Sequence, residues 1–256
     1  MPYLPLHGKD YGVPGVRLGH RKASRATAIS MEPPKSSARS AAKPAIGAIV
    51  LAAGRSIRMG QHKLLLPLGG RPLVSYAVEA ASASSADPVI VVLGASAAEI
   101  EGVLPLGRAH VCVNPTFAAG MSSSLALGIA TLSTFPPSSG RSISGALILL
   151  ADQPLISAGV VNSFLERASA TPDAIIAAAY AGVRGTPVYF PNRLFDELLH
   201  ITGDEGGRSV IARHPDMVSI QDIAESERGI DVDRREELEE LQSRWDHYSQ
   251  YLLDIG

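Results

Sequence analysis

A short glycine-rich segment with three cationic side chains is the part of this sequence best suited to chemistry. It runs from Leu51 to Lys63 as LAAGRSIRMGQHK and follows the apolar run 46–51. Glycines let backbone N–H groups turn toward an anion, and long cationic side chains neutralise its charge. The spacing fits neither a P-loop nor a dinucleotide fingerprint. The pattern favours a site for the phosphates of a nucleoside triphosphate, and an ordinary strand–helix loop with solvated charges is the alternative.

Asp152 is a candidate magnesium ligand. It directly follows the apolar run 146–150, which would place it at the carboxyl edge of a sheet. Mg²⁺ is usually held by one or two carboxylates together with phosphate oxygens and water. A helix N-cap is the alternative, because Pro154 and a helix near Ser157 follow. A second acid at the same edge would favour the metal.

Asp231 and Asp233 could supply that second acid. The two residues flank Val232, and alternation along an extended segment places both on one face. Asp233 and Glu236 also have the spacing of a capping box at the start of a final helix. A cap and a metal ligand are compatible, so both interpretations stay open.

Two further turns are rich in small residues. The first, Gly120-Met-Ser-Ser-Ser-Leu125, opens a predicted helix, so its free N–H groups would suit an anion or a base edge, although a plain N-cap serine fits equally well. The second, Gly203-Asp-Glu-Gly-Gly-Arg208, ends in a cation that could grip the phosphate of a second substrate. A surface turn is the alternative for this second segment.

The elements that must position these residues alternate between strand and helix. Short apolar runs predict buried parallel strands at Ile46–Leu51, Val89–Leu93, Ala146–Leu150 and Ala174–Ala179. Helical stretches are predicted at Pro72–Ser84, Ala97–Val103, Met121–Leu132 and Ala158–Ser169. A strand at Val188–Phe190, followed by 193–200 and 207–214, is expected to add a mixed edge, and Arg234–Tyr248 a closing helix. This order predicts an α/β fold with a mostly parallel sheet, whose ligands sit at the carboxyl ends of the strands.

Composition narrows the class of protein. Of 256 residues, 46% are apolar and 19% charged, which is typical of a globular chain, and the net charge of -2 gives no reason to expect nucleic acid binding. The single Cys112 cannot form an internal disulfide, which favours a cytoplasmic protein. The apolar runs are far shorter than the roughly 20 residues of a membrane helix.

The N-terminal segment differs from the rest. Residues 1–45 carry eight Lys or Arg and two Asp or Glu, and they lack any sustained periodicity. We therefore expect a disordered basic arm over residues 1–44 and one domain over residues 45–256. A true start at Met31 is the alternative explanation of the arm.

At this point the sequence resembles a known family. The segment from Leu51 to Pro67 resembles the signature of the MobA-like nucleotidyltransferases, and within them most resembles the molybdenum cofactor cytidylyltransferases. Supporting motifs follow in the family's order between residues 120 and 238. The resemblance implies a Rossmann-like, GT-A-type nucleotidyltransferase fold with a mostly parallel central sheet flanked by helices.

The resemblance also implies a set of site residues. It implies catalytic roles for Arg58, Lys63 and Asp152, and Mg²⁺ held by Asp152 and Asp233. The implied nucleotide-binding residues are Leu51, Ala52, Ala53, Gly54, Arg55, Ser56, Lys63, Gly120, Ser122 and Ser123. The implied acceptor-binding residues are Gly185, Thr186, Pro187, Asp204, Gly206, Gly207 and Arg208.

The implied reaction joins CTP to the Mo-molybdopterin cofactor, giving the cytosine dinucleotide form and pyrophosphate, for a recipient molybdoenzyme of the xanthine dehydrogenase type. Ala53 and the following Lys63-Leu-Leu-Leu-Pro67 run resemble the cytidine branch. Thr186 stands where many relatives have His, which puts the acceptor pocket in doubt. A guanylyltransferase, a transferase for another phosphorylated acceptor, and a cofactor carrier without chemistry remain the alternatives.

Overall fold

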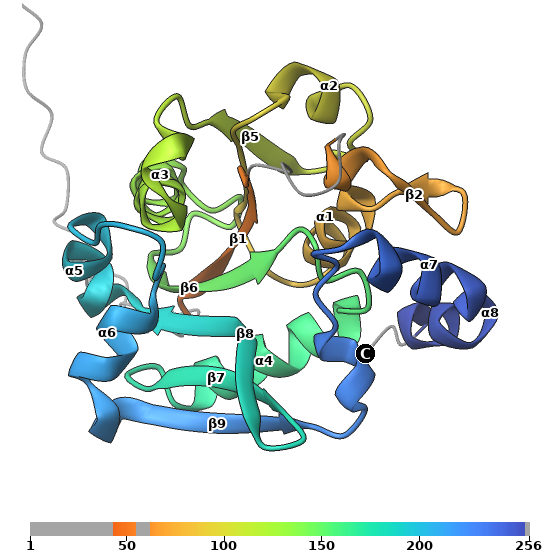
Figure 1. Ribbon diagram of the computed structural model, residues 1–256. Coiled ribbons are helices and arrows are strands. Elements are labelled where there is room, and N and C mark those ends of the chain that lie inside the picture. Colours follow the sequence, from red (N-terminus) through yellow and green to blue (C-terminus); the bar gives the residue numbers. More distant parts are fainter. Residues whose placement is uncertain (1–42, 55–61, 254–256) are drawn as a thin grey trace, which may run out of the picture. The chain divides into compact units, whose positions relative to one another are not determined.

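The computed structural model describes residues 43–54 and 62–253, which belong to one compact unit, Ala41–Gly256. Its centre is a seven-stranded sheet in the order β5-β4-β1-β6-β8-β7-β9 (Figure 1). The sheet strands are β1 Ala45–Ala52, β4 Val89–Leu93, β5 Ala109–Val113, β6 Ile143–Leu150, β7 Ile175–Tyr180, β8 Val183–Pro191 and β9 Val218–Ile223. The predicted arm lies almost wholly outside the described residues, and its boundary stays a prediction.

Helices follow most strands. The α-helices are α1 Val74–Ala83, α2 Ala97–Glu101, α3 Met121–Thr134, α4 Ala158–Ala170, α5 Phe195–Leu199, α6 Arg208–Arg213, α7 Arg235–Ser243 and α8 Trp245–Tyr248. Short 3-10 helices include η2 Lys63–Leu65, η3 Phe117–Ala119, η4 Asn192–Leu194, η5 Pro215–Met217, η6 Ser226–Gly229 and η7 Ser249–Leu253. A small hairpin, β2 Pro67–Leu68 and β3 Arg71–Pro72, follows η2.

All pairings in the large sheet are parallel except those of β8, which runs antiparallel to β6 and β7. The prediction of a mostly parallel sheet is therefore confirmed. The predicted place of the Val188–Phe190 strand is wrong, because β8 lies inside the sheet and not at its edge. The observed strand β8 is also longer than the predicted Val188–Phe190 strand, because the first half of Val183–Pro191 is not buried and carries no apolar run.

Alternate residues of each central strand enter different cores. In β1, Ala48 and Val50 pack on one side of the sheet, and Ile49 and Leu51 pack on the other. The first core is covered by α1, α4 and α7, and the second by α3, α5 and α6 (Figure 1). Burial on both faces explains why the strands read as continuous apolar runs.

The chain turns back at the centre of the sheet. From β1 it passes outward to β4 and β5, and then returns to β6 on the other side of β1. This reversal between β1 and β6 is the point where open α/β sheets bind ligands. The segments after Ala52 and Leu150 therefore lie side by side at one edge. Because β8 runs the opposite way and pairs Val188 with Ile148, its residues 185–187 reach the same edge.

Several other elements differ from the predicted pattern. The strands β5 and β9 and the β2–β3 hairpin have no counterpart among the predicted elements, since the two edge strands are only partly buried and lack an apolar run. The predicted closing helix over Arg234–Tyr248 is interrupted, because α7 ends at Ser243 and α8 begins at Trp245. Among the described residues, no helix is both long and apolar enough to cross a membrane.

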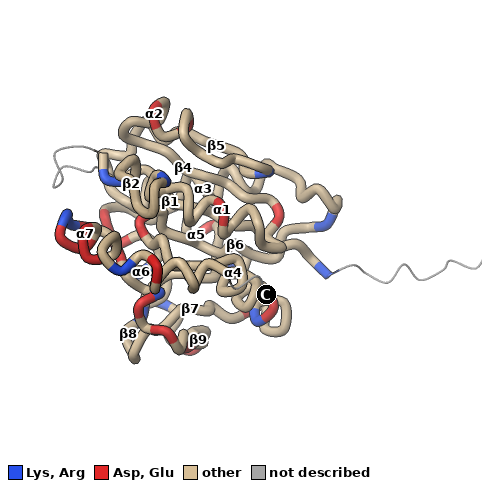
Figure 2. Tube along the Cα trace, turned by 90° about the vertical axis from the view of Figure 1, so that its right-hand side faces the viewer, with Lys and Arg blue, Asp and Glu red and all other residues tan. Residues whose placement is uncertain are grey.

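The C-terminal helices cover the β2–β3 hairpin. Trp245, the chain's one tryptophan, lies edge-on to Tyr76 with ring centroids 5.1 Å apart, and Gly69 N–H donates to Gln242 Oε1 at 2.9 Å. Figure 2 shows acidic residues concentrated along α7, which carries four glutamates. This packing ties the segment after Lys63 to the C-terminal part of the chain.

We predict that Gly69→Ala releases Trp245 from the hairpin. A Cβ at Gly69 would overlap the Trp245 indole, and the residue has a φ of 55°. The matched control is Gly70→Ala, whose φ of 80° gives the same backbone strain but whose Cβ would meet nothing within 4 Å. Tryptophan emission should shift to the red in the Gly69 variant alone. Equal spectra in the two variants would contradict this packing.

Candidate active site

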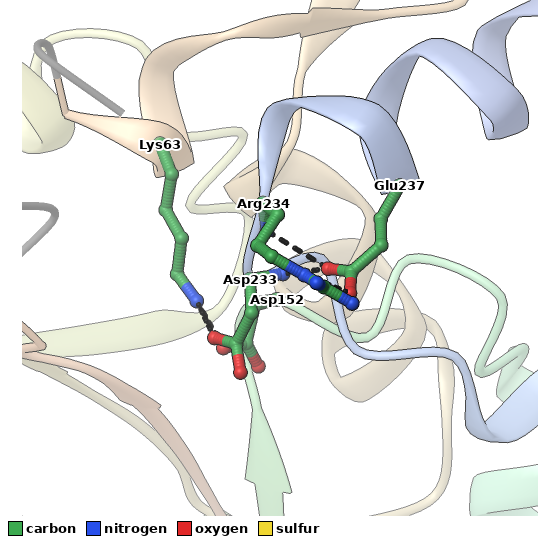
Figure 3. A network of polar contacts seen from close by, with 5 residues as sticks. All are labelled: Lys63, Asp152, Asp233, Arg234 and Glu237. Carbon is green, nitrogen blue, oxygen red and sulfur yellow. Dashed lines mark hydrogen bonds and ion pairs between the residues drawn. The ribbon is translucent and has the colours of Figure 1, made fainter. Parts of the chain in front are cut away.

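Lys63 lies between two carboxylates from distant parts of the chain. Its Nζ is 2.7 Å from Asp152 Oδ2 and 2.9 Å from Asp233 Oδ1 (Figure 3). The side chains of Leu64 and Leu66, 3% and 6% exposed, anchor η2 in the core and fix the place from which Lys63 extends. The structure thus brings together Lys63, Asp152 and Asp233, three of the residues for which a charged role was predicted.

Backbone contacts position Asp152. It follows β6, whose end is held to β1 by Ala151 N–H donating to the Leu51 carbonyl at 3.1 Å. Its own carbonyl accepts from Val232 N–H at 3.0 Å. The N-cap interpretation is wrong for Asp152, because Ser157 caps α4 by accepting from Val160 N–H. The Asp152 carboxylate is therefore available for charge chemistry.

The same contact positions the C-terminal acids. Val232 is fully buried in the core, whereas Asp231 and Asp233 on either side are exposed, in agreement with the predicted alternation. The capping box predicted with Glu236 is shifted by one residue. Glu237 accepts from Asp233 N–H at 2.6 Å and from Arg234 N–H at 2.8 Å (Figure 3).

The charges are strongly coupled. Burial alone would lower the pKa of Lys63, but attraction to Asp152 and Asp233 raises it overall, so its ammonium stays protonated. Enclosure by protein, then repulsion by Asp152 and Asp233, raises the pKa of Asp231 to about 6. Asp231 as a whole residue is exposed, so we attribute the rise of its pKa chiefly to repulsion by the two neighbouring carboxylates. Among the described residues, this edge therefore holds an excess of negative charge around Lys63.

The donor set fits a divalent cation. Asp152 Oδ1 is buried and has no hydrogen-bond partner among the described residues. Within that part of the chain, no group of three or more His, Cys, Asp or Glu side chains is arranged to hold a metal. Two carboxylates are nevertheless the usual protein contribution to Mg²⁺, because phosphates and water complete its coordination.

Only some of the predicted nucleotide-binding residues of the first loop lie among the described residues. Leu51 and Ala52 end β1, Ala53 is 5% exposed, and Gly54 is exposed beyond it. The remaining loop residues of the prediction, Arg55, Ser56 and Arg58, lie outside the described residues. The carboxyl ends of β1 and β4 are packed tightly, since a Cβ on Gly94 would lie 2.5 Å from the Ala53 carbonyl oxygen.

The two small-residue turns meet each other. Ser122, which is fully buried, donates its N–H to the Gly203 carbonyl at 3.0 Å and its hydroxyl to the Thr202 carbonyl at 3.1 Å. Met121 N–H donates to Asp204 Oδ1 at 3.3 Å. The first turn of α3 is therefore bonded to the predicted acceptor loop and is not open on that side.

The other predicted acceptor residues lie on β8 and before α6. Gly185 and Pro187 flank Thr186 on β8. Gly206 is buried with a φ of 56°, Gly207 precedes α6, and Arg208 is its exposed first residue.

Sequence reasoning missed the role of Gln153. This residue is 2% exposed and accepts a hydrogen bond from Thr186 Oγ1 at 2.6 Å. Its place directly after Asp152 was the available signal.

We predict that Glu237→Ala destabilises the protein by about 1 kcal/mol, the typical cost of losing a helix cap. The carboxylate holds two backbone N–H groups, and those hydrogen bonds, from Arg234 first, lower the pKa of Glu237 despite its partial burial. Glu236→Ala, an exposed position in the same turn, is the control and should change stability little. Urea unfolding measures both, and equal losses would contradict the shifted capping box.

Comparison with known proteins adds independent findings. The model of the MobA-like NTP transferase domain matches residues 48–218. The chain is 30% identical to the purine catabolism protein PucB of Bacillus subtilis over 66% of this chain and 81% of that protein. It is 31% identical to the nicotine blue oxidoreductase of Paenarthrobacter nicotinovorans, over 77% and 97% respectively.

A solved structure confirms the fold. The manganese complex of Rv0371c from Mycobacterium tuberculosis superposes with a TM-score of 0.61 at 24% identity, covering 78% of this chain and 98% of that one. The predicted Rossmann-like, GT-A-type fold is confirmed. The domain match spans well over half of the sequence and the charged cluster lies at its sheet edge, so the chain belongs to the MobA-like NTP transferase family and is a nucleotidyltransferase.

Proposed function

We propose that this nucleotidyltransferase transfers CMP from CTP to the terminal phosphate of the Mo-molybdopterin cofactor. The products are molybdopterin cytosine dinucleotide and pyrophosphate. The observation that carries the proposal is the placement of Lys63 between Asp152 and Asp233 at the reversal of the sheet. Nucleotidyl transfer needs positive charge near the phosphates and carboxylates that can share a divalent cation with them.

Asp152 and Asp233 would hold Mg²⁺ in this proposal. The buried and unpartnered Asp152 Oδ1 supports it, because a lone carboxylate oxygen without a donor is costly unless a cation compensates it. The related fold of Rv0371c has been solved with manganese, which supports a divalent ion here. When bound, the ion would supply positive charge against the triphosphate oxygens.

The chain's own groups would align and neutralise the reactants. A terminal phosphate oxygen of the acceptor forms a bond to the α-phosphorus of CTP, and the bond from that phosphorus to the bridging oxygen of the β-phosphate breaks. The electron pair leaves with pyrophosphate. Lys63 stays protonated and would face the negative charge that grows on the leaving group. No protein nucleophile is required.

Ala53 is the residue we propose to favour CTP. Its methyl group lies within the packed ends of β1 and β4, 2.8 Å from where a Cβ on Gly94 would stand. Ala53 is 5% exposed and directly precedes the exposed Gly54. Alanine at this position, in place of a second glycine, resembles the cytidine branch and supports cytidine over guanosine.

The acceptor would contact β8 and the loop before α6. Residues 185–187 reach the same edge as Asp152, and Thr186 is held there by Gln153 at 2.6 Å. A Thr bonded to Gln153 offers a different surface from the His of many relatives, so we leave open another phosphorylated acceptor. The name of PucB associates that protein with purine catabolism, which supports a recipient of the xanthine dehydrogenase type.

The proposal predicts pyrophosphate release from CTP, molybdenum cofactor and Mg²⁺. GTP in place of CTP should give much slower release. Asp152→Asn should lower turnover by at least about a hundredfold, the scale of one strong electrostatic contributor. Release is followed with a coupled pyrophosphate assay.

The other outcomes identify the alternatives. Release with GTP alone would indicate a guanylyltransferase. Release with neither nucleotide, together with tight cofactor binding, would indicate a carrier. A Lys63→Ala variant should lose turnover in a transferase, whereas a carrier would keep its cofactor affinity.

We further predict that Ala53→Gly weakens the preference for CTP. Removing one methyl group from a binding pocket changes discrimination by about tenfold or more. The ratio of kcat/KM for CTP to that for GTP should therefore fall by about tenfold, while Ala95→Gly, in the loop beyond β4, serves as the control. An unchanged ratio in the Ala53 variant would remove this residue from nucleotide selection.

A further inference from the structure

The turn that opens α3 is bonded to the loop 202–207 through its backbone and one hydroxyl. Ser122 contributes two hydrogen bonds, to the Thr202 and Gly203 carbonyls, and Met121 N–H contributes the third, to Asp204. A carboxylate at a helix N-terminus is favoured by the free N–H groups and by the helix dipole. The first half of the loop, residues 202–204, is thus attached to another element, although much of its surface is exposed.

The two segments approach each other closely. Gly120 has a φ of 107°, and a Cβ there would lie 2.5 Å from both Asp204 Oδ1 and the Gly203 carbonyl oxygen. The loop therefore rests directly on the α3 turn, with no space for a side chain between them. A displacement of the turn must be accompanied by a displacement of the loop.

The opposite side of the turn is bonded to the ends of β4 and β5. Asn114, 2% exposed, donates from Nδ2 to Ser123 Oγ and to Ser124 Oγ, each at 2.9 Å. Its backbone N–H donates to the Leu93 carbonyl at 2.7 Å. The turn is thus held between the strand ends and the loop 202–207.

The contacts continue as far as the first strand. The position where a Cβ on Gly94 would stand is 2.5 Å from the Ala53 carbonyl oxygen and 2.8 Å from Phe117 Cβ. Gly120 N–H in turn donates to the Phe117 carbonyl at 3.2 Å. A continuous set of packed and hydrogen-bonded residues therefore runs from the end of β1 to Asp204.

We propose that Ser122 and Asp204 are positioning residues that couple the nucleotide subsite to the acceptor subsite. The proposal rests on the proposed function, which places the nucleotide at 51–54 and the acceptor at the loop. A nucleotide that orders the end of β1 restrains the α3 turn, and the turn restrains the loop through these three hydrogen bonds. Coupling of this kind is reciprocal, so an ordered loop also favours nucleotide binding.

Hydrogen–deuterium exchange tests the coupling without an acceptor. The probe is CTP with Mg²⁺ added to the full chain, and a GTP arm is run in parallel. In the wild type, exchange should slow at 51–54 and, by about fivefold, at 202–207, the change expected from one net hydrogen bond. In Asp204→Ala, which removes one of the three hydrogen bonds, the slowing at 202–207 should become smaller, while that at 51–54 remains.

Two variants separate coupling from a merely structural contact. Asp204→Asn keeps an oxygen that can accept from Met121 N–H, so it should retain most of the effect. Asp196→Ala removes an exposed aspartate of α5, whose Oδ1 lies 3.9 Å from His200 Nδ1, and should behave as the wild type.

Three results would count against the coupling. Slowing at 51–54 without any change at 202–207 in the wild type would overturn it and leave the nucleotide site intact. Slowing at 202–207 that is undiminished in Asp204→Ala would overturn the role of Asp204. If neither nucleotide slows exchange at 51–54, the result contradicts both the proposed nucleotide site and the proposed coupling.

Discussion

The site depends on one ammonium group held between two carboxylates that are far apart in the sequence. Lys63 follows the first strand, Asp152 the strand beside it, and Asp233 lies near the C-terminus. Without Lys63, the repulsion among Asp152, Asp231 and Asp233 would oppose the close packing of this edge, and the raised pKa of Asp231 reflects that repulsion. The same excess of negative charge is what makes the edge suitable for a divalent cation. The same charged side chains therefore hold this edge together and make it suitable for a cation.

Main-chain contacts place these charges. Val232 is fully buried and donates its N–H to the Asp152 carbonyl, so the two acid-bearing segments are joined through the backbone and not through the acids themselves. Glu237 then fixes the backbone of Asp233, and Leu64 anchors the segment of Lys63. Apolar burial and backbone hydrogen bonds thus position the chain around the two carboxylates, which pair with Lys63. Such preorganisation is what electrostatic catalysis requires.

The sequence predicts most of the fold but only part of the site. Apolar runs such as Val89–Leu93 are read correctly because burial on both faces demands them. The edge strand Ala109–Val113 escapes detection because partial exposure permits His110 and breaks the run. Lys63 is predicted from its place in the glycine-rich cationic segment and Asp152 from its place after a strand, and the sheet topology brings the two together. The hydrogen bonds between Thr186 and Gln153 and between Ser122 and the loop 202–207 join segments that are far apart in the sequence. Local sequence patterns do not reveal which distant segments meet.

The separation of positioning groups from reacting groups has a consequence for substrate choice. Ser122, Asn114 and Val232 are buried and satisfy backbone partners, so changing them would disturb the fold. Ala53 is 5% exposed and packs against the end of β4, whereas Thr186 lies on β8 and donates to Gln153. We propose that Thr186 bears on which acceptor is taken, and that Lys63 and Asp152 bear on whether transfer occurs at all.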